Sequence, residues 1–493
     1  MCDRGYRAIW LSVLLLAGLL QGCAGRYFTP VAAPHEPSVH ALSQWPYHDL
    51  WTGIVFNGAK VGFSHLAVTV ADGVPGLYRI ESEASLQFHF LGFGKTVRLR
   101  AVDVVDENLH LVRLDAAHHL DGNDLVLKGT ASPERIDLTV DNNGHRTERS
   151  IALNGAVVPT SALLMYPVLH GLEVGREYRY QAFNGETLTV SEVVQRVEAF
   201  ERSELFTGQA YRIETRFHGQ KTTSWIDPSG RPLFELALNG VMISALEEEA
   251  AAKRYLVTAA LNKQDVMLDF SMVAVARPIP TPRALTRLSV LLDGEVPAPP
   301  SAGSQQCTPA EGGWHCTVDI GRPLPGAPGE ARHLLSSLTV PHGHPKIRAL
   351  AGRIAQGAED PREIIGRIVD WLSANVRSHP ADSFSALDVL ESGRAECQGH
   401  AYLYTALARA NGIPSRVMNG LVYSAAHDAF LFHSWTESLV DGRWIAVDPT
   451  FGQIPADATH LRIAEGEEAA DLLPLIDWVG RLSVKILDFS DGH

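Results

Sequence analysis

Long apolar segments are almost absent from this sequence of 493 residues. The one clear apolar run, at residues 8–20, would span only about 20 Å as a helix. That length is too short to cross a bilayer comfortably. Because no later segment reaches eighteen apolar residues, we expect no membrane-spanning helix after the run and a soluble remainder.

Basic residues are in deficit, with 42 Lys and Arg against 56 Asp and Glu, which gives a formal net charge of −14. Such a chain does not attract nucleic acid or anionic lipid head groups. We therefore expect no nucleic-acid partner. With 45% hydrophobic residues, the chain has enough apolar material for two or three cores.

Cysteine is scarce, with five residues, and one of them, Cys23, lies just beyond the apolar run. Arg4 and Arg7 precede the run, a pattern typical of a secretory signal. A cysteine after a small residue resembles the lipidation site of a bacterial lipoprotein, so we expect residues 1–22 to be removed. Lipid on Cys23 would then anchor the chain. By resemblance to sorted lipoproteins, Ala24 at the next position implies the outer membrane, facing the periplasm. An ordinary signal peptide with an incidental cysteine is the alternative.

Two further cysteines, Cys307 and Cys316, flank a glycine-containing segment that suits a hairpin. In an oxidising compartment they would close a small ring, which stabilises a fold by about 2.5–3 kcal/mol in the chain-entropy model. Two free thiols, or a zinc site that includes His315, are the alternatives.

The segment at residues 45–276 follows a tether at 23–44 and alternates apolar and polar residues between turn signals. This pattern predicts a large antiparallel, curved or barrel-like sheet, with one helix at 245–254. The segment has no nucleophile–base pattern, and its histidines, such as His118, fit sheet packing or the surface. We expect it to bind a substrate or partner, or to shield a catalytic cleft.

A Pro-rich linker with a small β segment, residues 277–330, separates this region from residues 331–493. The later region contains a thiol, an imidazole and a carboxylate in the order Cys397, His433, Asp448. Cys397 opens a helix-like run, where the helix dipole favours a thiolate. His433 and Asp448 lie on two predicted strands joined by a tight turn, which can place them side by side. Together they provide a nucleophile, a base and an orienter for the base.

Four segments around these residues resemble the transglutaminase-like superfamily of cysteine-dependent enzymes, which have a circularly rearranged papain-like core. They are CQGHA at 397–401, LARANGIPSR at 407–416, HSWTE at 433–437 and WIAVDPT at 444–450. The resemblance, over about residues 360–462, implies that Cys397 is the nucleophile, His433 the general base and Asp448 the third triad member. One departure is Ala395, two residues before the cysteine, where this superfamily often has glycine. Glu396 lies directly before the thiol, and a neighbouring carboxylate opposes thiolate formation.

The expected fold class is α+β, with an N-terminal antiparallel β-rich domain followed by a transglutaminase-like α+β catalytic domain. We expect acyl transfer on peptide or amide bonds of a peptide or protein substrate through a Cys397 thioester, with hydrolysis favoured over crosslinking. A true amine-accepting transglutaminase and a catalytically silent peptide-binding scaffold are the alternatives. No acidic loop has calcium-site spacing, and Cys397 with His400 supplies only half of a zinc site. We therefore expect no cofactor and no metal.

Overall fold

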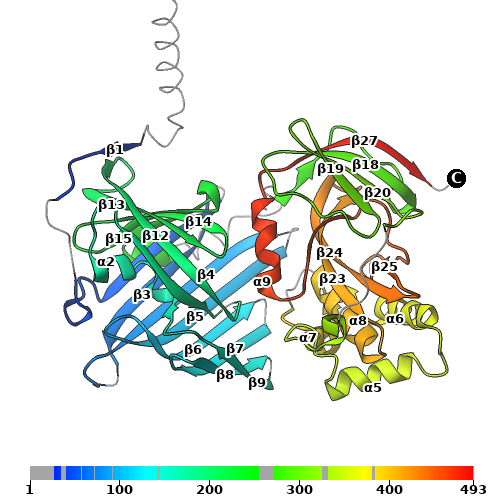
Figure 1. The fold of residues 1–493 in the computed structure, drawn as a ribbon, viewed down its shortest axis with the longest axis horizontal. Coiled ribbons are helices and arrows are strands. Elements are labelled where there is room, and N and C mark those ends of the chain that lie inside the picture. Colours follow the sequence, from blue (N-terminus) through cyan, green and yellow to red (C-terminus); the bar gives the residue numbers. More distant parts are fainter. Residues whose placement is uncertain are drawn as a thin grey trace, which may run out of the picture.

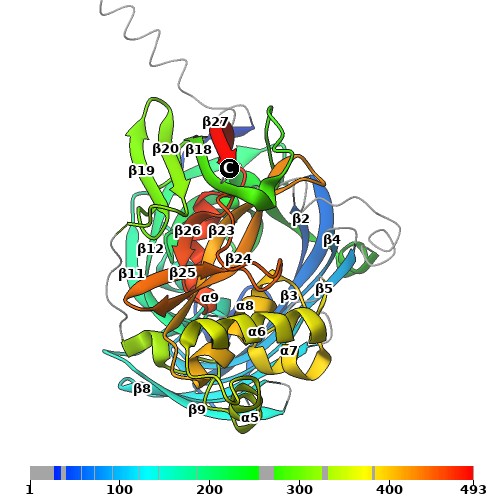
Figure 2. The same cartoon turned by 90° about the vertical axis from the view of Figure 1, so that its right-hand side faces the viewer.

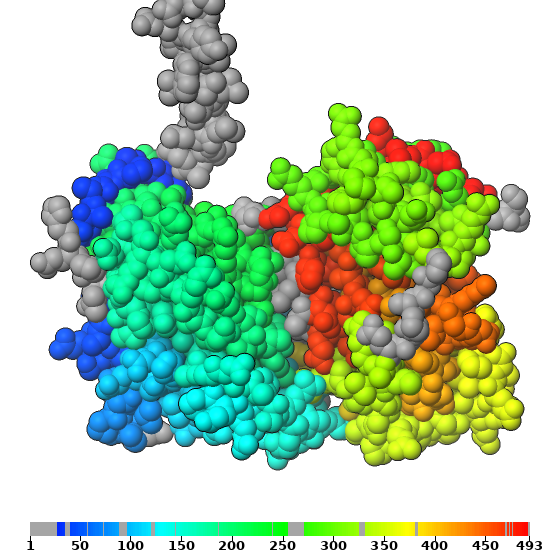
Figure 3. All heavy atoms as spheres, in the orientation of Figure 1, coloured from blue at the N-terminus to red at the C-terminus, as the bar shows by residue number. Residues whose placement is uncertain are grey.

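The structure is a computed structural model, and it describes residues 27–34, 40–56, 58–71, 73–90, 93–120, 123–142, 144–185, 187–254, 271–324, 331–379 and 383–491. The predicted signal at 1–22 and the predicted lipid site Cys23 lie outside these residues. Within them, no helix combines the length and the apolar character needed to cross a membrane. The molecule consists of two neighbouring lobes, which Figures 1 and 3 show in blue to green and in green to red.

The first lobe is one sixteen-stranded sheet, in which β16 pairs with β2 and so joins the later strands to the earlier ones. All neighbouring strands are antiparallel except β10 and β11. One short helix, α2 (Tyr166–His170), lies in this region. The strands are β1 (Phe28–Pro30), β2 (Asp49–Phe56), β3 (Ala59–Val70), β4 (Leu77–Phe90), β5 (Phe93–Asp106), β6 (Leu111–Leu120), β7 (Asn123–Ala131), β8 (Arg135–Asn142), β9 (His145–Ala152), β10 (Val158–Pro159), β11 (Glu177–Asn184), β12 (Thr189–Ser203), β13 (Gln209–Phe217), β14 (Gln220–Ile226), β15 (Pro232–Ala237) and β16 (Met242–Glu247).

The alternating sequence of the strands produces this sheet. In β8, Ile136, Leu138 and Val140 are buried, and the residues between them are more exposed. Successive side chains of a strand point to opposite faces, so such alternation buries one face and leaves the other to solvent. The buried faces of β6, β7 and β8 form one core cluster together with Phe183 of β11, which shows that the sheet curls until distant strands meet.

The second lobe contains a five-stranded sheet covered by helices. Its longest buried element is α8 (Cys397–Ala410). One side of α8 packs on strands β23 and β24, and the other side packs on helices α5, α6 and α7. The other elements here are β17 (Val273–Ala274), α5 (Pro345–Ile354), α6 (Pro361–Asn375), β21 (Arg377–Ser378), α7 (Ala386–Ser392), β22 (Arg394–Ala395), β23 (Ser415–Ser424), β24 (Ala429–Val440), β25 (Arg443–Val447), β26 (Leu461–Glu465) and α9 (Ala469–Leu472).

A four-stranded sheet completes this lobe and lies at the end opposite α5 and α6 (Figure 2). It consists of β18 (Leu285–Asp293), β19 (Gln305–Ala310), β20 (Gly313–Asp319) and the C-terminal strand β27 (Ser483–Asp491). β27 pairs with β18, although the strands are almost two hundred residues apart in the sequence. Leu288 and Val290 of β18 share a core with Leu421 and Phe430 of the five-stranded sheet, so the two sheets form one packed unit.

The predicted α+β fold class is wrong, because the described part of the chain is mostly β, with 49% of its residues in strands and 19% in helices. The physical reason is that the sixteen-stranded sheet spans residues 28–247, and that the described part of the second lobe adds sheets of five, four and two strands. Among the described residues, the longer helices lie within residues 345–410. The predicted helix at 245–254 is also partly wrong, since residues 242–247 form β16 and helical structure begins at residue 249.

The two lobes touch where the edge of the large sheet meets α7. The Asn142 side chain donates to Ser385 Oγ at 2.9 Å, and Ser385 is the N-cap of α7. His145 Nε2 lies 3.2 Å from Glu391 Oε1 at the other end of that helix. Because α7 packs on α8, the large sheet contacts the helix that supports the Cys397 helix.

Gly420 offers a test of how tightly the five-stranded sheet is packed. It pairs with His433 of β24 on one side and lies against β26 on the other. A Cβ atom at this position would collide with the Leu461 carbonyl oxygen. Gly420→Ala should therefore lower the free energy of unfolding by about 1–3 kcal/mol, as overpacking does, measured by urea denaturation.

The matched control is Gly352→Ala in α5, where an added Cβ meets no atom within 4 Å. Alanine is favoured over glycine inside a helix by about 0.5–1 kcal/mol, so this variant should be equally stable or more stable. Equal loss of stability in both variants would contradict the described contact between β23 and β26.

Candidate active site

Cys397 is the first residue of α8, as its sequence context predicts. The N-cap is Glu396, whose carboxylate accepts hydrogen bonds from the Gln398 and Gly399 amides at 2.9 Å each. Acidic groups at this position satisfy helix amides that have no intrahelical partner. Two of the first amides of α8, which could otherwise stabilise an oxyanion, are thus taken by Glu396.

The Cys397 thiol is held in its neutral form. Burial, followed by the negative charge of Glu396, raises the pKa of Cys397 well above its ordinary value. The thiol donates to Glu396 Oε2 at 3.2 Å. A backbone hydrogen bond from Ser434 acts in the opposite direction, but the net shift disfavours the thiolate. The opposition that Glu396 implies in the sequence is therefore present in the structure.

His433 and Asp448 lie side by side. His433 is on β24 and Asp448 directly follows β25, the next strand of the hairpin. His433 Nε2 donates to Asp448 Oδ2 at 2.8 Å, which leaves Nδ1 as the free nitrogen of the ring. Ser434, the residue after His433, is the backbone partner of the Cys397 sulfur. The thiol thus meets β24 next to the imidazole.

The Asp448 carboxylate is fully buried and ionised. Its Oδ1 accepts from the backbone amides of Thr450 and Phe451 at 2.8 and 3.1 Å. Burial alone would raise the pKa of Asp448, but the charges and hydrogen bonds of His433 and His460 hold it well below its usual range. An ionised Asp448 can fix the tautomer and the orientation of His433.

His460 is the member of the cluster that the sequence analysis missed. Its Nε2 donates to Asp448 Oδ2 at 2.9 Å, and its Nδ1 lies 2.9 Å from the Asp457 carbonyl oxygen. Burial would lower the pKa of His460, but Asp448 and Asp457 outweigh burial and raise it to about 9. Its only signal in the sequence is its position, twelve residues after Asp448.

The Phe451 ring packs against one face of the His433 imidazole. The Phe451 ring stacks on it at 5.1 Å between centroids, and the Arg283 guanidinium lies 4.0 Å from the centre of the Phe451 ring. Phe451 is 42% exposed although it is a large apolar residue. An exposed aromatic beside a base is well placed to contact a substrate.

His433, Asp448 and His460 also form a group whose ligand atoms lie within 4.8 Å of one another. Both Nε2 atoms already donate to the same carboxylate oxygen, so a metal ion would have to displace these protons. The raised pKa of His460 opposes that loss, and the group fits a hydrogen-bonded charge cluster better than a metal site. His400, the other ligand of the weak zinc alternative, hydrogen-bonds through Nδ1 to the Glu396 carbonyl oxygen.

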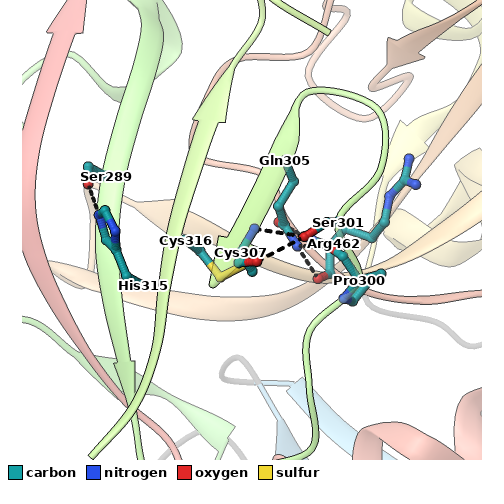
Figure 4. The surroundings of a disulfide bond; sticks show 8 residues. All are labelled: Ser289, Pro300, Ser301, Gln305, Cys307, His315, Cys316 and Arg462. Carbon is teal, nitrogen blue, oxygen red and sulfur yellow. Dashed lines mark hydrogen bonds between the residues drawn. A yellow bond between two sulfur atoms is a disulfide. The ribbon is translucent and has the colours of Figure 1, made fainter. Parts of the chain in front are cut away.

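Cys307 and Cys316 form a disulfide between β19 and β20, shown in Figure 4. The same hairpin holds the active-site end of β26. The Gln305 side chain donates to the Arg462 carbonyl oxygen at 2.9 Å and accepts from its amide at 2.8 Å. Because Arg462 is two residues after His460, the disulfide-bonded hairpin supports the strand that carries the second imidazole.

Residues 348–449 match the family model of the transglutaminase-like superfamily, so the second lobe contains a transglutaminase-like domain. Cys397, His433 and Asp448 lie inside this range and His460 lies outside it. A protein-glutamine gamma-glutamyltransferase of Pseudomonas aeruginosa is 28% identical over 145 residues, and an uncharacterized protein of Mycobacterium leprae is 26% identical over 140 residues. Each match covers 26% of this chain, and they span 21% and 49% of the two relatives.

Two solved structures are also similar to parts of the chain. A proposed cysteine protease from Cytophaga hutchinsonii has 18% identity and a TM-score of 0.27, covering 43% of this chain and 84% of that one. A β-barrel-like protein from Brucella abortus has 8% identity and a TM-score of 0.32, covering 43% of this chain and 98% of that one. At these TM-scores the likeness is too weak to assign a fold or an activity.

The raised pKa of His460 predicts how stability depends on pH. A histidine whose pKa rises from 6.5 to about 9 on folding contributes stability that is complete below pH 6.5 and is lost as the pH rises through 9. His460→Gln should remove this contribution. The stability advantage of the natural protein over the variant should shrink by on the order of 3 kcal/mol between pH 6.5 and 9.5, measured by urea unfolding. A constant difference across that range would contradict a charged His460.

The contact between Glu396 and the thiol predicts a change in reactivity. Glu396→Gln removes the charge that opposes the thiolate, so the pKa of Cys397 should fall. The pH at which iodoacetamide alkylates Cys397 at half of its maximal rate should then be lower than in the natural protein. Mass spectrometry of the Cys397 peptide measures this rate. The lost cap should cost about 0.5–2 kcal/mol of stability. Glu363→Gln, an exposed change on α6, is the control and should leave the midpoint unchanged.

Proposed function

We propose that the chain is a cysteine-dependent acyl-transfer enzyme that acts on peptide or amide bonds, and that water is its preferred acceptor. The observation that carries this proposal is the His433–Asp448 pair. The imidazole donates a hydrogen bond from Nε2 to a buried carboxylate. Its other nitrogen, Nδ1, is free, and the ring belongs to the strand that contacts the Cys397 sulfur. This is the relation between a base and its orienter that nucleophilic catalysis requires.

In the proposed reaction His433 Nδ1 takes the Cys397 proton as the sulfur attacks the carbonyl carbon of the substrate. The proton then passes to the leaving nitrogen, the carbon–nitrogen bond breaks, and a thioester with Cys397 remains. Water, deprotonated by the same imidazole, attacks the thioester, which releases the acid and restores the thiol. The first amide of a helix has no intrahelical acceptor, so the Cys397 amide is the candidate oxyanion donor.

The neutral resting thiol agrees with this order of events. At rest the thiol keeps its proton, so proton transfer to His433 accompanies attack. A substrate that reaches Cys397 must compete with Glu396, which accepts the thiol proton at rest. Displacement of that contact would free the sulfur for His433, and it would also free helix amides for the developing oxyanion.

Transfer to an amine is the second candidate, because a glutamyltransferase is among the relatives and thioester chemistry serves both acceptors. The two are separated by incubating the enzyme with a glutamine-containing peptide, with and without a primary amine. Hydrolysis gives a glutamate peptide or two fragments, whereas transfer gives a peptide that has gained the mass of the amine. A dominant amine adduct would replace the hydrolytic proposal.

The triad predicts a graded set of losses in that assay. Cys397→Ala should abolish turnover, and His433→Ala should be nearly as damaging because the two residues act as a unit. Asp448→Asn should lower kcat by up to ~10⁴-fold, by analogy with a serine triad. Circular dichroism and melting curves serve as the folding control. Full activity in a folded Cys397→Ala variant would contradict Cys397 as the nucleophile, whereas no turnover by the natural protein would leave a silent peptide-binding scaffold.

A further inference from the structure

The inner face of the large sheet carries small side chains where a filled core would need large ones. On β4, β5 and β6 the residues Ser82, Ala101 and Ala116 are direct cross-strand partners. Thr52, Ser64 and Ala84 form a similar row on β2, β3 and β4. All six line one hollow. Interiors are normally packed to crystal-like density, so a row of small inward residues leaves space.

The hollow has a volume of about 550 Å³, which lies within the range of about 300–1,000 Å³ found for small-molecule sites. Its walls come from both halves of the sheet: β2 to β6 on one side, and β13 to β16 on the other. Leu50, Leu66 and Leu114 add apolar surface. A ligand in this space would therefore be surrounded by apolar and hydroxyl groups.

Two carboxyl groups lie on the same inner face. Asp103 Oδ2 accepts from Ser161 Oγ at 2.5 Å, and Glu235 Oε2 accepts from Ser224 Oγ at 2.8 Å. Asp103 is only 8% exposed. Burial raises the pKa of Asp103 to about 6, and it raises the pKa of Glu235 as well. A buried carboxylate without a cation is costly.

The basic residues at the hollow do not supply that cation. The Arg100 side chain is 65% exposed and pairs with Glu81 on the outer face of the sheet. Burial lowers the pKa of His118, so its imidazole is neutral at neutral pH. His218 is likewise held neutral by burial, and its ring contacts Ser191. The inner wall is thus apolar with an excess of negative charge.

We propose that this hollow binds an amphipathic molecule with an apolar chain and a cationic head group, of the primary-amine class. The chain would fill the space above the small side chains, and the ammonium group would pair with Asp103 or Glu235. An anionic amphiphile such as a fatty acid would place like charges together in a poorly hydrated space, which is unfavourable. The site is independent of the Cys397 chemistry.

The test uses the purified protein and the fluorescent apolar amine 1-aminoanthracene, which is displaced by twelve-carbon competitors. Dodecylamine should displace the probe at a concentration at least about tenfold lower than dodecanoate does, because the protein should bind the amine at least about tenfold more tightly. Asp103→Asn should reduce the ratio between the displacing concentrations of dodecanoate and dodecylamine. Cys397→Ala should bind like the natural protein, which separates this site from the proposed enzyme.

Adjacent residues on opposite faces of β6 give a matched pair of variants. Ala116 is buried and lines the hollow, whereas Ala117 is exposed. Ala116→Leu should weaken probe binding at least about tenfold by filling the space, and Ala117→Leu, which adds the same volume outside, should not. If melting curves show that Ala116→Leu does not fold, Ala101→Leu takes its place. Absence of saturable binding, equal effects of the two leucine variants, or tighter binding of dodecanoate would overturn the proposal.

Discussion

The buried Asp448 carboxylate organises the active-site end of the second lobe. It has no exposure to solvent, yet it carries a full negative charge, so every bond it accepts is needed to offset lost hydration. Two imidazoles and two backbone amides provide those bonds. The amides hold the chain just after β25, and the imidazoles hold β24 and the start of β26. Removal of one partner of such a buried pair typically costs about 3–5 kcal/mol, so folding and site geometry depend on the same group.

The charge cluster continues beyond the transglutaminase-like segment. His460 connects Asp448 to Asp457, and Arg283 Nη1 contacts Asp457 Oδ2 at 2.7 Å. Arg283 comes from the segment before β18, far from the triad in the sequence, and the disulfide-bonded hairpin reaches β26 through Gln305. The site is therefore built from at least three separate stretches of chain. A fragment limited to residues 348–449 would contain the triad but would lack His460 and the groups that hold it in place.

Local signals in the sequence were sufficient for much of this site. The helix-like run that Cys397 opens indicated α8, and a two-residue turn at Asp441 and Gly442 set the register that brings His433 beside Asp448. The pairing of Cys307 with Cys316 likewise follows from a short hairpin. In each case the interacting residues are close in the sequence, or one tight turn relates them.

Long-range pairings were beyond the reach of the same reasoning. β27 pairs with β18, and β16 closes on β2, and no local pattern records which distant strand is the partner. His460 was missed for this reason, since its role depends on the docking of β26 beside β23. The α+β prediction was wrong for the same reason, because it gave too little weight to sheets that assemble from distant strands. The hollow was missed too: small inward residues are visible in the sequence only once the strand register is known.

Glu396 has a consequence for how long the protein survives in an oxidising setting. Peroxide attacks cysteine as the thiolate, and the first product, a sulfenic acid, can go on to irreversible forms. A neighbouring carboxylate that keeps Cys397 neutral at rest therefore slows this damage, at the cost of a less reactive nucleophile. The same side chain caps the helix, so chemical durability and helix stability are combined in one residue. The disulfide at Cys307 and Cys316 removes the two other thiols of the described chain from the same hazard.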